Sequence, residues 1–188
     1  SDPNAKITKK SKSPLSFHPI ALIFGLLSFV SYLVEGAVGD WSALYLFEDK
    51  GILIEEAVMG VMLFNGTMCI GRLLGNRLGK HLTSKQVVVG GYLLGSIAMG
   101  LIVFLPGHAS MYTYLLLGIS LAMIVPNLFS AMGEQNVIPM TQAVATSTML
   151  GYMGILMGPA LIGFIAHGTS LTVAFIVLTT LLVVSAGI

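Results

Sequence analysis

Six long apolar runs constrain the fold of this sequence of 188 residues more than any other feature. A helix needs about 20 apolar residues to cross the hydrocarbon core of a bilayer. Runs of roughly that length lie at residues 19–46, 56–76, 86–105, 110–132, 142–166 and 170–188. Because a backbone in lipid must satisfy its own hydrogen bonds, these runs predict an all-α membrane protein with six transmembrane helices.

Composition supports a membrane protein and excludes several other classes. Hydrophobic residues make up 55% of the chain and charged residues only 9%, which would leave a soluble domain with too little polar surface. The net charge of +1 gives no sign of a nucleic-acid partner. The few basic residues are therefore interpreted as topology signals.

The distribution of basic residues predicts the orientation of the helices. Short loops rich in Lys and Arg stay on the cytoplasmic side of a membrane. Four such residues fall in or beside the turn at 71–85, namely Arg72, Arg77, Lys80 and Lys85, and four lysines precede residue 18. We expect residues 1–17, 75–85 and 133–141 on the cytoplasmic side, with Lys50 as the one basic residue on the outer side.

The chain divides into two parts. Residues 1–18 are polar and lack an apolar stretch followed by a cleavage site, so we expect a cytoplasmic linker and not a signal peptide. Residues 19–188 are expected to form the six-helix bundle. The sequence lacks an initiator Met and stops inside an apolar run, so we expect a piece of a longer protein with its last helix truncated.

Polar residues recur on one face of four of the six runs. Polar groups that face lipid are costly, so they usually turn toward the bundle interior or a water-filled cavity. Four that lie well inside their runs are our candidates for lining a substrate cavity: Tyr32, Asn65, Asn127 and Tyr152. Hydrogen bonding between helices without solute contact is the alternative. The third and sixth runs have no ionisable residue in their interior and are expected to face lipid.

Small residues in the fifth run predict close helix packing. Gly151, Gly154 and Gly158 recur at steps of three and four residues and are followed by Pro159. Such a row lets two helix backbones approach each other.

The sequence carries no signature of an enzyme, metal site or cofactor. It has no H-E-x-x-H, no G-x-S-x-G and no His or Cys cluster at ligand spacing. The single cysteine, Cys69, is interpreted as a small packing residue. We therefore expect no catalytic residues, no bound metal and no cofactor.

Three stretches carry a resemblance to a known family. Residues 35–45 read EGAVGDWSALY, residues 71–78 read GRLLGNRL and residues 151–163 read GYMGILMGPALIG. With these stretches the chain resembles the carboxy-terminal half, helices seven to twelve, of a major facilitator superfamily (MFS) transporter. It is similar to the bacterial fucose-permease-like branch. The superfamily's signature turn, G-x-L-x-D-R-x-G-R-R, is matched only in part by residues 71–85.

The resemblance implies a fold and a function. It implies two inverted three-helix repeats, alternating access against an amino-terminal six-helix half, and a place in the bacterial inner membrane. We expect a secondary transporter of a small solute, coupled to protons as a symporter. A multidrug or metabolite exporter of the same superfamily, and a membrane assembly protein that transports nothing, remain alternatives. Solute, direction and coupling ion stay open.

Charged residues inside the runs supply candidates for coupling and gating. Glu35 is the proton-coupling candidate and Asp40 a weaker one, because a poorly solvated carboxylate favours its neutral form. No basic residue of this chain except the loop residue Lys50 is expected at the depth of Glu35. At the cytoplasmic end we expect a gate in which Glu134 pairs with Arg72 or Arg77, with snorkelling of each side chain to the interface as the alternative.

Overall fold

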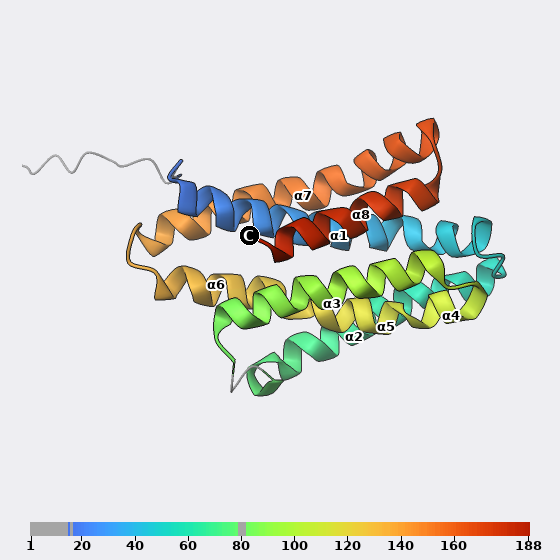
Figure 1. Ribbon diagram of the computed structural model, residues 1–188, viewed down its shortest axis with the longest axis horizontal. Coiled ribbons are helices and arrows are strands. Elements are labelled where there is room, and N and C mark those ends of the chain that lie inside the picture. Colours follow the sequence, from blue (N-terminus) through green and yellow to red (C-terminus); the bar gives the residue numbers. More distant parts are fainter. Residues whose placement is uncertain (1–14, 16, 79–81) are drawn as a thin grey trace, which may run out of the picture.

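A computed structural model describes residues 15, 17–78 and 82–188, and every regular element among them is an α-helix (Figure 1). The helices are α1 (Pro19–Glu48), α2 (Ile54–Leu78), α3 (Ser84–Phe104), α4 (Gly107–Tyr112), α5 (Tyr114–Ala122), α6 (Ile124–Glu134), α7 (Met140–Gly168) and α8 (Leu171–Ala186). Five spans in this part of the chain are long and apolar enough to cross a bilayer, and α8 is a shorter apolar helix. The all-α membrane class is confirmed. Most of the expected linker lies outside the described residues.

Helices α4, α5 and α6 form one span from Gly107 to Glu134. Thr113 and Met123 separate them, and both keep helical backbone angles, so the span continues through each break. At the first break the Thr113 hydroxyl donates to the carbonyls of Ala109 and Ser110 and so competes with the helical backbone. Near the second, Pro126 has no N–H to donate to the preceding turn.

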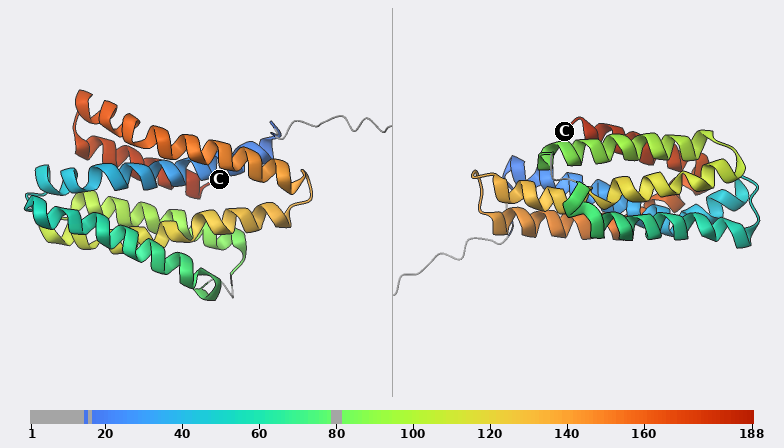
Figure 2. Two further views of the ribbon diagram at one scale, coloured as in Figure 1. Left: turned by 180° about the vertical axis from the view of Figure 1, so that it is seen from behind. Right: turned by 90° about the horizontal axis from the view of Figure 1, so that it is seen from below.

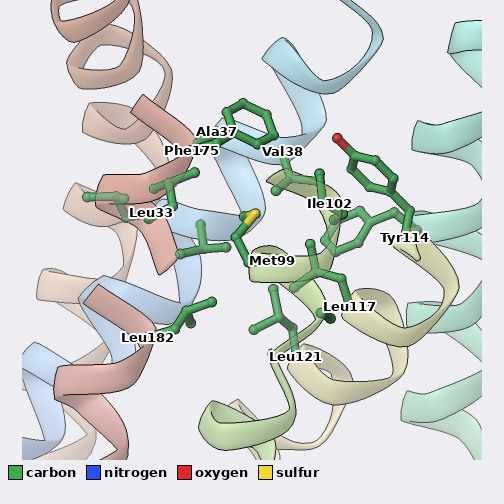
Figure 3. Packing of buried hydrophobic residues seen from close by; sticks show 14 of the residues in the cluster. Leu33, Ala37, Val38, Met99, Ile102, Tyr114, Leu117, Leu121, Phe175 and Leu182 are labelled. Atoms are coloured by element: carbon green, nitrogen blue, oxygen red, sulfur yellow. The ribbon is translucent and has the colours of Figure 1, made fainter. Parts of the chain in front are cut away.

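The helices pack in three main pairs. Helix α1 lies along α7, α2 lies along α5, and α3 lies along α8, as the two views of Figure 2 show. Side chains from α1, α3, α5 and α8 fill the space between these pairs (Figure 3). The core includes Leu33, Met99, Leu117 and Phe175, all essentially inaccessible to solvent.

The expectation that residues 86–105 and 170–188 face lipid is wrong for one side of α3 and of α8. Tyr92 and Ile102 of α3 and Phe175 and Leu182 of α8 are fully buried. The Tyr92 hydroxyl donates to the carbonyl of Leu27 in α1 at 2.6 Å. Residues without charge suit a protein core as well as lipid, so the absence of ionisable groups did not distinguish the two environments.

Successive connections lie at opposite ends of the bundle (Figure 1). Hydrogen bonds join the connection from α1 to α2 to the end of α3 and to α8. Lys50 Nζ donates to the carbonyls of Val103 at 2.6 Å and Leu105 at 2.9 Å, where α3 ends. Asp49 Oδ2 accepts a hydrogen bond of 2.6 Å from Thr172 of α8.

This contact explains why Lys50 departs from the charge bias. The last carbonyls of a helix lack helical partners and carry partial negative charge, which an ammonium group satisfies. Burial lowers the pKa of the Lys50 amine, and the neighbouring Asp49 carboxylate opposes that shift. Lys50 is therefore a fixed structural contact in this fold and not a topology signal.

Candidate functional site

Two charged side chains within the spans meet between α1 and α2. Arg72 Nη2 lies 3.0 Å from Glu35 Oε2 and 3.3 Å from Glu35 Oε1. The side chains keep 43% of their surface exposed for Arg72 and 21% for Glu35. One guanidinium nitrogen thus serves both carboxylate oxygens. The Nε and Nη1 groups of Arg72 have no hydrogen-bond partner among the described residues.

The expectation that Glu35 has no basic neighbour at its depth is wrong. Arg72 lies six residues before the end of α2, and its side chain extends to Glu35 on the neighbouring helix. The expected depth came from counting backbone residues along each run. It omitted the long reach of an arginine side chain.

The pair lies near the middle of α1. Glu35 follows Pro19 by 16 residues and precedes Glu48 by 13. At 1.5 Å per residue, it lies about 24 Å from one end of the helix and about 20 Å from the other. A solute site of a secondary transporter is commonly found at this depth.

Tyr32 lies beside the ion pair and stacks on Tyr152. The rings of Tyr32 in α1 and Tyr152 in α7 are parallel within 4°, with centroids 6.4 Å apart. Tyr32 precedes Glu35 by about one helical turn and lies within electrostatic reach of Glu35, Arg72 and Tyr152. We refer to Tyr32, Glu35, Arg72 and Tyr152 as the polar cluster.

The two asparagine candidates satisfy their amides within their own helices. Asn65 Nδ2 donates to the Val61 carbonyl at 3.0 Å, and Asn127 Nδ2 donates to the Met123 carbonyl at 2.8 Å. Asn65 is exposed and Asn127 is half-buried. Among the described residues, no hydrogen bond links either side chain to the polar cluster. Of the four candidates, the two tyrosines contact each other, and the two asparagines are hydrogen-bonded within their own helices.

The expected cytoplasmic gate pair of Arg72 and Glu134 is not formed in this structure. Arg72 is engaged with Glu35. Glu134 Oε1, at the end of α6, accepts a hydrogen bond of 2.7 Å from Ser84 Oγ at the start of α3. Arg77 is in the last turn of α2, and its side chain lies outside the described residues.

The glycine row of α7 lies against α1. A Cβ atom added at Gly154 or Gly158 would meet the backbone carbonyl of Phe29 or Leu33, and one at Gly151 would meet the Tyr32 ring. Three hydrogen bonds also connect the helices: Ser28 with Ser147 at 2.8 Å, Ser147 Oγ to the Phe24 carbonyl at 2.9 Å, and Trp41 Nε1 to the Pro159 carbonyl at 2.9 Å. Helix α1 therefore packs on α7 at backbone distance.

The remaining candidates are separate from the polar cluster. Asp40 is exposed and precedes Trp41, more than one turn beyond Glu35. Cys69 is exposed in this chain, so its interpretation as a packing residue is wrong. The described part of the chain holds no group of three or more His, Cys, Asp or Glu side chains that could bind a metal ion.

Sequence comparison finds relatives among membrane transporters. The chain is 42% identical over 157 residues to an uncharacterized MFS-type transporter of Yersinia pestis. It is 30% identical over 170 residues to the membrane protein MosC of Rhizobium meliloti and 28% identical over 159 residues to an uncharacterized transporter of Sinorhizobium fredii. These matches cover 82%, 89% and 82% of this chain but only 40%, 42% and 41% of the relatives. No family model matches the sequence.

Structural comparison gives the same class of fold. Two crystal structures of a variant of the peptide transporter POT, one with sulfate and one with alafosfalin, match with TM-scores of 0.75 and 0.74. The matches cover 88% and 89% of this chain and 36% of each POT chain, at 14% and 15% identity, so the likeness concerns the fold alone. Over most of its length this chain is therefore similar to about two fifths of an MFS-type transporter, and its fold agrees with that likeness.

Proposed function

We propose that this chain is the carboxy-terminal bundle of a secondary active transporter that moves a small solute by alternating access. The polar cluster carries this proposal. An ion pair in mid-membrane is costly against lipid, so it belongs on a cavity or a protein interface. The exposed side of Glu35 and Arg72 would then face a central cavity, closed on its other side by an amino-terminal six-helix half.

The pairing of the helices supports an inverted repeat of three plus three. Numbering the six spans in order, extensive contacts join spans one and five, two and four, and three and six, and span three also packs along span four. Exchanging one with four, two with five and three with six turns the set of the first three contacts into itself. That symmetry is expected of two related triplets. We extend the proposal to the fucose-permease-like branch and to the bacterial inner membrane.

We infer that Glu35 couples the transport of solute to protons. With Glu35 ionised, its carboxylate holds the Arg72 guanidinium at 3.0 Å. Protonation removes that charge, weakens the contact between α1 and α2 and leaves Arg72 free to interact elsewhere. Asp40 is the alternative coupling residue. Glu134 and Arg77 remain our candidates for a gate at the cytoplasmic end, where Glu134 accepts a hydrogen bond from Ser84.

Transport by the full-length protein in proteoliposomes tests this function. A solute would first be identified by the thermal stabilisation that it gives, since specific binding stabilises by mass action. Glu35→Gln mimics the protonated acid, so it should abolish accumulation driven by a pH gradient and leave solute exchange intact. Asp40→Asn tests the alternative coupling residue and should retain both activities if Glu35 takes up the proton. If Glu35→Gln accumulates solute as the parent does, Glu35 is not the coupling residue.

A further inference from the structure

The guanidinium of Arg72 has donors left over for a ligand. Its five N–H groups lie in one plane, and Nη2 alone contacts Glu35. The edge formed by Nε and Nη1 has no partner among the described residues, and 43% of the side chain is exposed. A planar edge with two N–H donors matches a carboxylate group, which can accept both bonds at once.

The two stacked tyrosines supply a flat apolar surface in the neighbourhood of Arg72. The Tyr32 and Tyr152 rings are parallel within 4°, and 65% of Tyr152 is exposed. Aromatic faces bind other rings by offset stacking. Neither phenol hydroxyl has a hydrogen-bond partner among the described residues, so both can serve a polar substituent on a ring.

We propose that the solute of the polar cluster is a small monocarboxylate that carries a planar ring. Its carboxylate would bind the Nε and Nη1 edge of Arg72, and its ring would stack on Tyr152. This proposal rests on the function proposed above and names the solute class of the same site. Within the cluster, the groups that face Glu35 are Arg72 from α2 and Tyr32 on its own helix, and Tyr152 from α7 stacks on Tyr32. A bound anion would therefore compete with Glu35 for one positive charge.

That competition gives the ion pair a role in coupling. When Glu35 is ionised, the pair is neutral overall and attracts an anion weakly. When Glu35 is protonated, Arg72 carries an uncompensated charge that the carboxylate of the solute neutralises. Solute and proton then bind cooperatively, and linkage makes the effect reciprocal. Each monocarboxylate would be transported with one proton as a neutral unit.

Binding of three probes to the full-length transporter tests the solute class. Benzoate has the carboxylate and the ring, acetate has only the carboxylate, and benzamide has only the ring. Calorimetry at fixed pH should give the strongest binding for benzoate, with acetate and benzamide each at least about tenfold weaker. If acetate binds as well as benzoate, the ring is not recognised. If benzamide binds as well as benzoate, the carboxylate is not recognised. Either result overturns the proposal.

Variants locate the binding site. Arg72→Gln should weaken benzoate binding by at least about tenfold. Arg72→Lys keeps a charge for Glu35 but loses the planar edge, so it should also bind benzoate more weakly while folding normally. Tyr152→Leu should weaken benzoate but not acetate. Lys85→Gln and Tyr112→Leu change an exposed lysine and an exposed tyrosine elsewhere and are the matched controls. Unchanged benzoate binding in folded Arg72→Lys and Tyr152→Leu contradicts the proposed site.

The proton count distinguishes this proposal from the function on which it rests. Calorimetry in buffers of different ionisation enthalpy measures the protons taken up with each benzoate. Uptake that is lost in Glu35→Gln supports both proposals. Binding that depends on Arg72 without proton uptake retains the solute class and overturns coupling through Glu35. Coupled transport of another solute without any benzoate binding retains the function and overturns the solute class.

Discussion

Helix α1 makes two kinds of contact, and they differ in what holds them together. Toward α7 it presents backbone and small side chains, with glycines at closest approach and neutral hydrogen bonds. Toward α2 it presents Glu35, whose partner Arg72 is partly exposed. The first contact depends on shape and does not respond to charge. The second depends on an ion pair that a single proton can neutralise.

The difference suggests which helices move together and which contact changes during transport. Packing at backbone distance makes α1 and α7 a rigid unit, because well-packed surfaces transmit displacement and do not deform easily. The half-exposed ion pair contributes little to stability, since solvent screens such pairs. We infer that α1 and α7 move together, whereas the contact between α1 and α2 responds to protonation and solute.

The largest expected effect is on the contact between α1 and α7. Gly154→Leu would place its Cβ against the Phe29 carbonyl, which is backbone and cannot give way as a side chain can. Overpacking of this kind costs about 3 kcal/mol or more. Thermal unfolding of the full-length protein in detergent should therefore show severe destabilisation.

Gly66→Leu is the control for this substitution, because a Cβ added at Gly66 meets nothing within 4 Å. It should leave stability unchanged or raise it slightly, since glycine is a poor helix former. Equal loss of stability in the two variants would show that α1 and α7 are not in backbone contact at this site.

A smaller effect on stability is expected at the contact between α1 and α2. The double-mutant cycle of Glu35→Gln and Arg72→Gln should give a coupling energy of about 1 kcal/mol or less for unfolding, because the pair is partly solvated. The same variants should lose pH-driven transport by at least about tenfold. In transport, the double variant should be no worse than the more impaired single variant. The opposite result, a coupling energy as large as that of a buried pair together with retained transport, would show that the pair stabilises the fold and has no part in coupling.

The apolar runs predicted the helices because length and hydropathy act locally. The glycine row of α7 was also visible, since a period of three to four residues is a property of one helix. The pairing of Glu35 with Arg72 was not predicted, because it depends on which helices are neighbours and on how far a long side chain reaches. The role of Lys50 was missed for the same reason: its partners are backbone carbonyls of Val103 and Leu105, more than fifty residues away.

The candidate cavity shows the same limit. Tyr32 and Tyr152 come together because α1 and α7 are packed side by side. Asn65 and Asn127 looked equivalent to them by position within their runs. Their amides donate to backbone carbonyls four residues earlier. The short side chain of asparagine reaches these carbonyls, whereas the hydroxyl of a tyrosine does not. Polarity alone therefore did not distinguish the tyrosines, which contact each other across two helices, from the asparagines, which bond within their own helices.

The central claim is that Glu35 takes up the transported proton while Arg72 holds its ionised form. Infrared difference spectroscopy of the full-length transporter tests it directly, because a protonated carboxylic acid absorbs apart from a carboxylate. Addition of solute near neutral pH should produce a carboxylic acid band in the parent and in Asp40→Asn, and no such band in Glu35→Gln. The same band in Glu35→Gln as in the parent would contradict the account, because the proton would then reside on another group.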